Sequence, residues 1–239
     1  VIAAMACHSA PMMLALALLG MTCSIVQMAA SPEPTRAGPH ATEELNVTGF
    51  SMLHVTTSLV VNVAVGDGHH VLVSGSAHEF VAFVDMQGTL VLTQKPAGVG
   101  TNATVSVVVP RPLDFIGATT NSHVTADRAT GSLLAVAGSS IKVDELETGF
   151  AGITAVAMSS ITVASGRAAF VLASVADTSG VFLGEFNATT AMVSTSYRSK
   201  FSGLYAQQVT VFVSSRSNVS IASAQELGYS CFSSELILP

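Results

Sequence analysis

The sequence predicts an all-β protein, a parallel β-solenoid (β-helix-like) of about six short coils with an N-terminal β-hairpin cap. Three observations lead to this prediction. A short serine-led phrase recurs at a nearly constant interval along the chain, and apolar and polar residues alternate within it. The chain is also rich in aliphatic residues, with no Trp and only 6% aromatic residues. Stacked coils account for all three, because they share a narrow interior that aliphatic side chains fill.

Each repeat contains one apolar anchor residue, and the successive anchors follow one another at nearly equal intervals. The residue after the anchor is polar in five of the six repeats, and the next one is mostly apolar. This period of two is typical of a strand with one buried face. The predicted core anchors are Val124, Ile141, Ile161, Val181, Phe201 and Val219.

A serine stands two residues before every anchor. Serine favours turns by bonding nearby backbone groups, and stacked hydroxyls can also bond one another as a ladder. No serine lies in the motif context of a nucleophile with His and Asp partners, so we predict a structural column and no catalytic residue. The column is Ser122, Ser139, Ser159, Ser179, Ser199 and Ser217.

A second short apolar alternation precedes each anchor, as in "LLAVAG" (133–138) and "ITAVAM" (153–158). Each unit of about twenty residues is therefore expected to hold two or three very short strands joined by turns. One unit cannot bury its own apolar face, whereas stacked units can.

The N-terminal segment has a different character from the rest. Residues 1–30 contain no charged residue and are strongly apolar, and a Pro-rich polar stretch follows. This pattern predicts a secretory signal peptide, with a membrane anchor as the alternative. The predicted organisation is 1–30 signal peptide or anchor, 31–44 linker, 45–226 a single β-solenoid domain (45–112 hairpin lead-in, 113–226 repeats) and 227–239 a C-terminal tail.

The lead-in is expected to contain two hairpins. "SMLHVTTSLVVNVAV" passes through "GDGHH" to "VLVSGS", and "EFVAFV" passes through "DMQG" to "TLVLTQ", with Asp/Gly turn chemistry in both cases. A further strand, "TVSVVVP", is stopped by Pro110 and Pro112. These strands would cap the stack, since an uncovered coil is an exposed edge.

The order of these motifs resembles a known family. The Gly49–Phe50 pair, "VNVAVGDG", "VDMQGTLVLTQ", "VSVVVPRPLDFI" and the serine-led repeats are similar to the putative auto-transporter adhesin family with the head GIN domain. The resemblance implies an extracytoplasmic β-solenoid-like fold and no catalytic residues. Most of the glycines of the family's repeats are replaced here, so we expect the turns to be rounder.

Charge and cysteine content exclude several classes. The formal net charge is −6 and the nine basic residues are scattered singly, so we expect no nucleic-acid partner. Two of the three cysteines lie in the signal region, which leaves Cys231 to pair with another chain or to remain a partly covered thiol. No cofactor is predicted.

Two groups of residues are candidates for chemistry. Asp127 and Asp144, with Glu145 beside them, could stack on neighbouring coils as a metal or catalytic pair, or could simply form a solvated turn. His69 and His70 in "GDGHH" could bind a metal, but adjacent strand residues point to opposite faces, so we predict a polar pair at a turn and no metal site.

Four of the six asparagines begin an N-x-[ST] sequon, which favours a secretory route with glycans on exposed turns. The alternative is that Ser/Thr-rich strand starts generate sequons without consequence. The predicted glycosylation sites are Asn46, Asn102, Asn187 and Asn218.

These features predict a secreted or cell-surface, non-enzymatic adhesin or extracellular scaffold module. Its Ser/Thr-rich faces would meet carbohydrate or a cell-surface or matrix protein, and it would touch membrane only through an uncleaved N-terminal segment. The main alternative is a carbohydrate-active enzyme, lyase- or hydrolase-like, with its acidic site at Asp127, Asp144 and Glu145. A self-assembling structural subunit joined end to end or through Cys231 is a third possibility.

Overall fold

The computed structural model describes residues 42–74, 80–95, 104–232 and 235–237, in which fifteen strands and no helix occur. The strands form one sheet that winds on itself, with parallel pairing between successive coils. This confirms the predicted all-β parallel solenoid. Within the described residues there is accordingly no helix that could span a membrane. The expected signal peptide or anchor lies outside them.

The strands fall into short and long classes. The short strands are β1 (Thr42–Leu45), β2 (Met52–Thr56), β3 (Val60–Val65), β4 (His70–Ser74), β5 (Phe80–Val84), β6 (Thr89–Gln94), β7 (Thr104–Val109), β8 (Leu113–Thr119) and β15 (Glu235–Ile237). The long strands are β9 (His123–Val136), β10 (Ser140–Val156), β11 (Ser160–Val175), β12 (Gly180–Thr195), β13 (Lys200–Ser214) and β14 (Asn218–Phe232).

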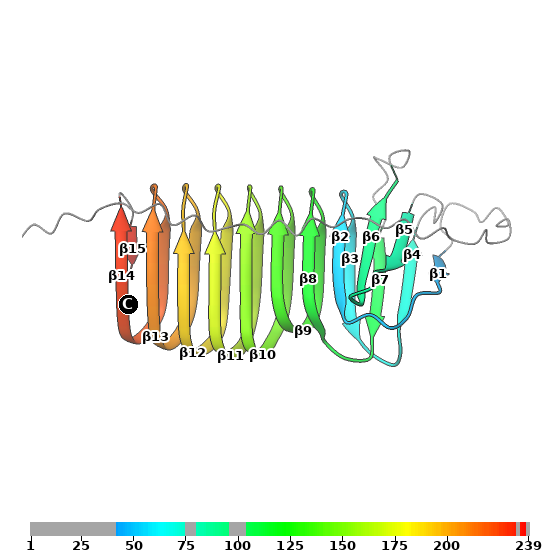
Figure 1. The fold of residues 1–239 in the computed structure, drawn as a ribbon, viewed down its shortest axis with the longest axis horizontal. Helices are drawn as coiled ribbons and strands as arrows, with labels where there is room; N and C mark the ends of the chain where they lie inside the picture. The colour runs from blue at the N-terminus through cyan, green and yellow to red at the C-terminus, as the bar shows by residue number, and fades with distance from the viewer. Residues whose placement is uncertain (1–41, 75–79, 96–103, 233–234, 238–239) are drawn as a thin grey trace, which may run out of the picture. The chain divides into compact units, whose positions relative to one another are not determined.

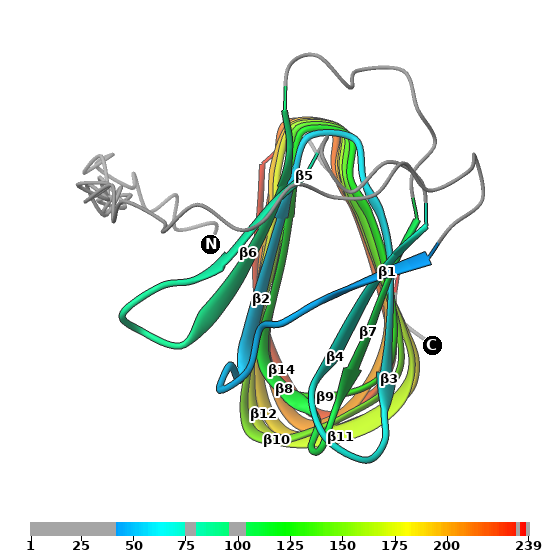
Figure 2. The same cartoon turned by 90° about the vertical axis from the view of Figure 1, so that its right-hand side faces the viewer.

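Each long strand makes one coil of the stack (Figures 1 and 2). It starts after a tight turn, runs down one flat side, bends, and returns along the other side to the next turn. We call these parts the turn edge, the first side, the curved edge and the second side. In β10, residues 140–145 lie on the first side, 146–149 on the curved edge and 150–156 on the second side.

The prediction of two or three short strands in each repeat is wrong. Strand pairing continues around the curved edge, where Leu146 aligns with Gly166 and Thr148 with Ala168. Each repeat is therefore one bent strand of 14 to 17 residues. The polar residues at the bend are typical of a turn in sequence, but the backbone there is still hydrogen-bonded to the neighbouring coil.

Successive anchors lie directly beside one another. Ile141 pairs with Val124 on one side and Ile161 on the other, and the series continues through Val181 and Phe201 to Val219. All six anchor side chains are buried in one continuous aliphatic core. Small differences in coil length are absorbed at the curved edge, since register shifts occur there in β9 and β13.

The turn edge of the described chain consists of seven two-residue turns in which both residues have positive φ. The backbone N–H of Met158 donates to the carbonyl of Asp177 in the next coil (2.9 Å), and most turns repeat this bond. The turns are thus equally tight with and without glycine, so the expectation of rounder turns is wrong. The turn residues are Thr57, Ser58, Thr120, Asn121, Ala137, Gly138, Ala157, Met158, Asp177, Thr178, Tyr197, Arg198, Ser215 and Arg216.

The stack begins earlier than residue 113. β2 pairs in parallel with β8, and β3 pairs in parallel with β9, so the segment 52–65 already makes one coil. β6 and β7 add the next layer, parallel to β2 and β3. The antiparallel strands β1, β4 and β5 lie beyond that layer as the cap (Figure 1).

One of the two predicted hairpins is present. β5 and β6 pair antiparallel around the Asp85–Gly88 turn, as expected. β3 and β4 do not pair with each other, because β7 lies between them. β3 pairs in parallel with β7 on one edge and β9 on the other. The turn residues of "GDGHH" cannot predict these partners, because they lie far away in the sequence.

The predicted C-terminal tail also continues the fold. β14 runs to Phe232 in constant register with β13, and β15 pairs with the first residues of β14. The described chain therefore adds strands beyond residue 226, where the solenoid was expected to end.

Candidate functional site

The serine column is built into the turn edge. All six serines are buried. The backbone N–H of Ser139 donates to Oγ of Ser159 (3.3 Å), and that of Ser159 donates to Oγ of Ser179 (3.1 Å). The expected ladder of hydroxyls is thus a ladder of N–H groups bonded to hydroxyls one coil on. The same bond joins Ser122 to Ser139 and Ser199 to Ser217.

Ser159→Ala is expected to lower the free energy of unfolding by about 1–3 kcal/mol, because the buried N–H of Ser139 would lose its acceptor. Denaturant unfolding followed by circular dichroism measures the change. The matched control is Ser160→Ala, one residue on, whose side chain is exposed. A loss of stability no larger than that of the control would contradict the structural role of the column.

Two of the three acidic candidates are paired with cations. Glu145 Oε2 lies 2.8 Å from Arg128 Nε, and Asp144 Oδ1 lies 3.7 Å from Lys142 Nζ. Asp127 is exposed. No group of three potential metal ligands occurs in the described part of the chain. This arrangement of surface ion pairs gives the alternative of a polysaccharide-cleaving site no support.

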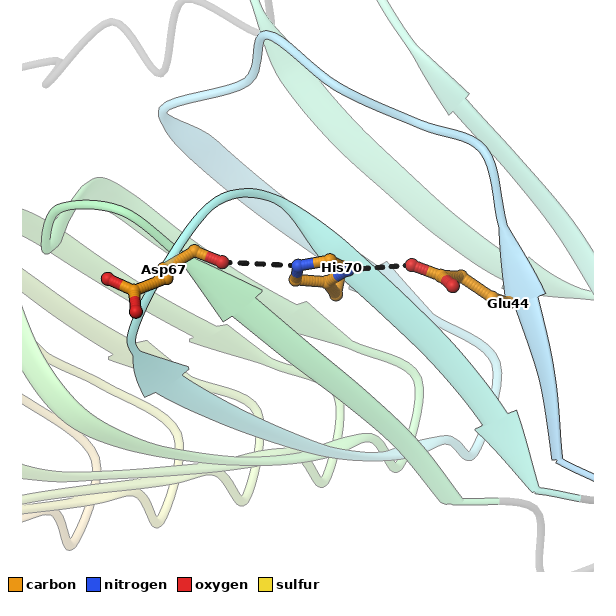
Figure 3. Close-up of polar contacts among 3 residues, drawn as sticks. All are labelled: Glu44, Asp67 and His70. Atoms are coloured by element: carbon orange, nitrogen blue, oxygen red, sulfur yellow. Dashed lines mark hydrogen bonds and ion pairs between the residues drawn. The ribbon is translucent and has the colours of Figure 1, made fainter.

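The two histidines of "GDGHH" bond in different directions. His69 Nε2 lies 3.0 Å from the carbonyl oxygen of Phe50, and the two rings meet edge to face. His70 Nδ1 lies 2.7 Å from Glu44 Oε1, and its Nε2 lies 3.1 Å from the carbonyl oxygen of Asp67 (Figure 3). His70 thus ties the outermost strand, β1, to β4.

The pKa of His70 is expected to lie above its ordinary value of 6.5, chiefly because its ring bonds to the Glu44 side chain. A raised pKa means that the contact stabilises the fold below about pH 6.5 and that this contribution is lost as the pH rises through the folded-state pKa. NMR titration of the imidazole measures the pKa. Glu44→Gln should move it down, and an unchanged pKa in that variant would contradict the role of Glu44.

The sequons and Cys231 lie in different settings. Asn46 and Asn187 are exposed, Asn218 is half-buried in β14, and Asn102 lies outside the described residues. Glycosylation at these sites stays a prediction. The backbone of Cys231 lies in β14 opposite Val213, and its pairing with another chain also stays a prediction.

The main feature that sequence reasoning missed is an apolar patch on the outer face of the second side. Outward positions on that side carry Phe150, Phe170, Leu172, Met192 and Phe212 across coils β10 to β13. Phe150 and Phe170 stack with ring centroids 5.7 Å apart. Phe150 is 50% exposed and Phe212 45%. The signal was present, since Phe150 and Phe170 are one repeat apart and so hold the same place in successive units.

Polar groups continue the same outward column. In register with the two stacked phenylalanines come Thr190, Gln208 and Glu226. Gln208 Nε2 donates to Glu226 Oε2 (3.0 Å). The second side therefore presents an apolar area with hydroxyl, amide and carboxylate groups at its margin. By contrast, the outward residue after the anchor on the first side is polar in five of the six repeats, with Phe182 as the exception.

Comparison with known proteins agrees with this architecture. A family model described as "Putative auto-transporter adhesin, head GIN domain" matches residues 49–234. No curated protein matches the chain.

Solved structures of bacterial proteins share the fold. A putative adhesin from Bacteroides fragilis has a TM-score of 0.70 at 10% identity, covering 85% of this chain and 98% of its own. Putative adhesins from Parabacteroides distasonis (TM-score 0.64, 16% identity, 83% and 96% covered) and Parabacteroides merdae (0.60, 13%, 84% and 97%) are also similar. At such low identity these likenesses show the fold alone.

Proposed function

Because this chain belongs to the putative auto-transporter adhesin family with the head GIN domain, we propose that it is a non-enzymatic adhesion module. It is secreted or displayed at the cell surface, and it binds carbohydrate through the apolar patch on its second side. The observation that carries the proposal is this patch, which is formed by side chains with no part in the core.

The rigidity of the support favours a binding role. The outward side chains stand on strands that are hydrogen-bonded to a coil on each side, from β10 to β13. A binding surface held by packed strands loses little conformational entropy when a ligand arrives. Exposed apolar side chains gathered on one face typically mark an interaction site, whereas single ones need no explanation.

The chemistry of the patch suits carbohydrate. A sugar ring has apolar C–H faces and a rim of hydroxyl groups, so it matches an apolar surface bordered by hydrogen-bonding groups. Phe150 and Phe170 supply aromatic faces, and Thr190, Gln208 and Glu226 supply donors and acceptors beside them. Ser194 and Thr210 are exposed and align with Phe212 and Met192 of the patch, and their hydroxyl groups can bond those of a sugar in the same way.

Binding to a glycan array tests the proposal, with Phe150→Ser compared with Phe182→Ser. The two phenylalanines are equally exposed, at 50% and 51%, but Phe182 lies on the first side. We expect Phe150→Ser to weaken binding about tenfold, as loss of an aromatic contact at a binding site does, and Phe182→Ser to leave it unchanged.

A reducing-sugar release assay on the bound glycans is run beside the array. No release is expected from an adhesion module. Release of sugar would overturn the non-enzymatic assignment, and equal losses in the two variants would overturn the assignment of the patch. An array on which the protein binds nothing would overturn carbohydrate as the ligand.

A further inference from the structure

Basic residues cluster at the turn edge of the last coils. From this cluster we propose that the carbohydrate ligand of the protein is an acidic polysaccharide. The inference rests on the proposed function and adds to it the charge of the ligand. The basic cluster consists of Arg198, Arg216 and Lys200. Carboxylate or sulfate groups on the polysaccharide would bind the two arginines, while the neutral faces of the sugars lie over the apolar patch.

The position of the basic cluster follows from the coil register. Arg198 and Arg216 hold the same second position of consecutive turns, with the N–H of Arg198 bonded to the carbonyl of Ser215 (3.0 Å). Neighbouring coils are about 4.8 Å apart, so the two guanidinium groups start from adjacent points on the turn edge. Lys200 follows at the start of β13, where the first side begins beside the turn, and its side chain is exposed.

The three cations are available to a ligand. In the described residues, the ion pairs of the surface use His70, Arg128, Lys142 and Arg167, and none involves the basic cluster. The only acidic residue among the fourteen turn positions is Asp177, one coil before Tyr197. Asp177 stands in the turn next to Arg198, but neither Arg198 nor Arg216 forms an ion pair among the described residues, in a chain whose formal net charge is −6.

Arg198 and Arg216 adopt the left-handed backbone conformation of the turn edge. Tyr197, Arg198 and Arg216 have φ of 53°, 57° and 61°. A left-handed conformation costs a residue with a side chain about 1–2 kcal/mol, which glycine would avoid. Most other turns carry small or polar residues here. All seven turns share this conformation, so what distinguishes the last two is an arginine at the second position of each.

The apolar patch approaches the basic cluster at Phe212. Phe212 lies on the second side of β13, and the chain reaches Arg216 four residues later. Tyr197 is 65% exposed and, with Arg198, lines a shallow hollow on the turn edge. The rest of the lining is Ala157, Met158, Asp177, Thr178 and Ser215. A tyrosine ring can pack against the face of a sugar ring. The planar guanidinium group of the neighbouring arginine can bind a carboxylate or sulfate substituent of that sugar in a bidentate manner.

Two alternative anionic partners fit the cluster less well. Duplex nucleic acid carries one charge per about 1.7 Å, and a protein with net negative charge and three clustered cations cannot neutralise a row of phosphates. An anionic membrane attracts each surface cation by only about 1 kcal/mol, which is too little for three residues to hold the protein there.

The test compares polygalacturonate, heparin and neutral dextran as probes, so that carboxylate, sulfate and uncharged chains are distinguished. Binding is measured at about 0.05 M and about 0.5 M salt, since a charge-based contact weakens with ionic strength. The variant is Arg198→Gln with Arg216→Gln. The control is Arg128→Gln with Arg167→Gln, which removes the same amount of charge elsewhere on the surface.

We expect at least one acidic chain to bind more tightly than dextran, and the Arg198/Arg216 variant to lose about tenfold or more in affinity while the control keeps it. Equal losses in the two variants would overturn the assignment to the basic cluster. Equal binding of dextran and the acidic chains would overturn the inference and leave the proposed function standing. A protein that binds none of the three probes, and no glycan on the array, would overturn both.

Discussion

Phe201→Ala is expected to lower the free energy of unfolding by about 3–5 kcal/mol, the usual effect of removing a buried phenylalanine ring. Phe201 is 1% exposed and stands in the anchor column between Val181 and Val219. The coils on both sides are fixed by their own strand pairing, so they cannot close the cavity that the lost ring leaves. Guanidinium unfolding followed by circular dichroism gives the total change.

The control for this substitution is Phe182→Ala. Phe182 pairs with Ser202, the residue after Phe201, but its ring is 51% exposed and points outward. We expect its loss to change stability by no more than about 0.5 kcal/mol. In a repeat stack local unfolding can precede global unfolding, so hydrogen exchange should show the Phe201→Ala effect first in β12 to β14. Similar effects of the two substitutions would mean that the assigned inward and outward faces are wrong.

The parts of the fold that sequence alone predicts are those fixed by local alternation. Val124 and Ile161 can be recognised as buried because a period of two holds around them, and a shift of one residue would turn every such side chain outward. The recurring serine identifies the turn that precedes each anchor. The stacking of repeats then follows, since a single unit cannot bury its apolar face.

Pairing at the N-terminal end could not be predicted in this way. "GDGHH" has the turn chemistry of a hairpin, yet β7 separates β3 from β4. Strand partners there are chosen by contacts between distant segments, such as Val61 with Val105 and Val124. Local sequence determines that the chain turns, whereas long-range packing determines which strand lies beside it.

The candidate surface could be predicted only in part. Arg198 and Arg216 both precede a column serine, and Phe150 and Phe170 share a repeat position, so each pair could be placed on neighbouring coils. Whether the phenylalanines face inward depends on how the chain passes the curved edge. The inward alternation resumes there at Ala151, which turns Phe150 outward. The alternation of inward and outward side chains therefore shifts at the bend, and no particular residue in the sequence indicates this shift.

Gly203→Ala is expected to destabilise the protein by about 3 kcal/mol or more, which is large for the addition of one methyl group. Gly203 has φ of 95°, and a Cβ atom there would overlap the carbonyl oxygen of Leu183 in the neighbouring coil. The obstacle is backbone, so no side-chain rotation relieves it, and the two coils would have to separate. Denaturant unfolding measures the effect.

The cause of this close approach is the length of one coil. β13 aligns Gly203 with Leu183 but Tyr205 with Asn187, so its path between the two paired positions is shorter than that of β12. Fewer residues must pass the curved edge, and the chain shortens its path through positive φ at Gly203 and Leu204. Gly180→Ala is the matched control, because a Cβ atom at Gly180 meets nothing within 4 Å. If Gly203→Ala were as stable as that control, the shortened coil would have to pass the bend by another route.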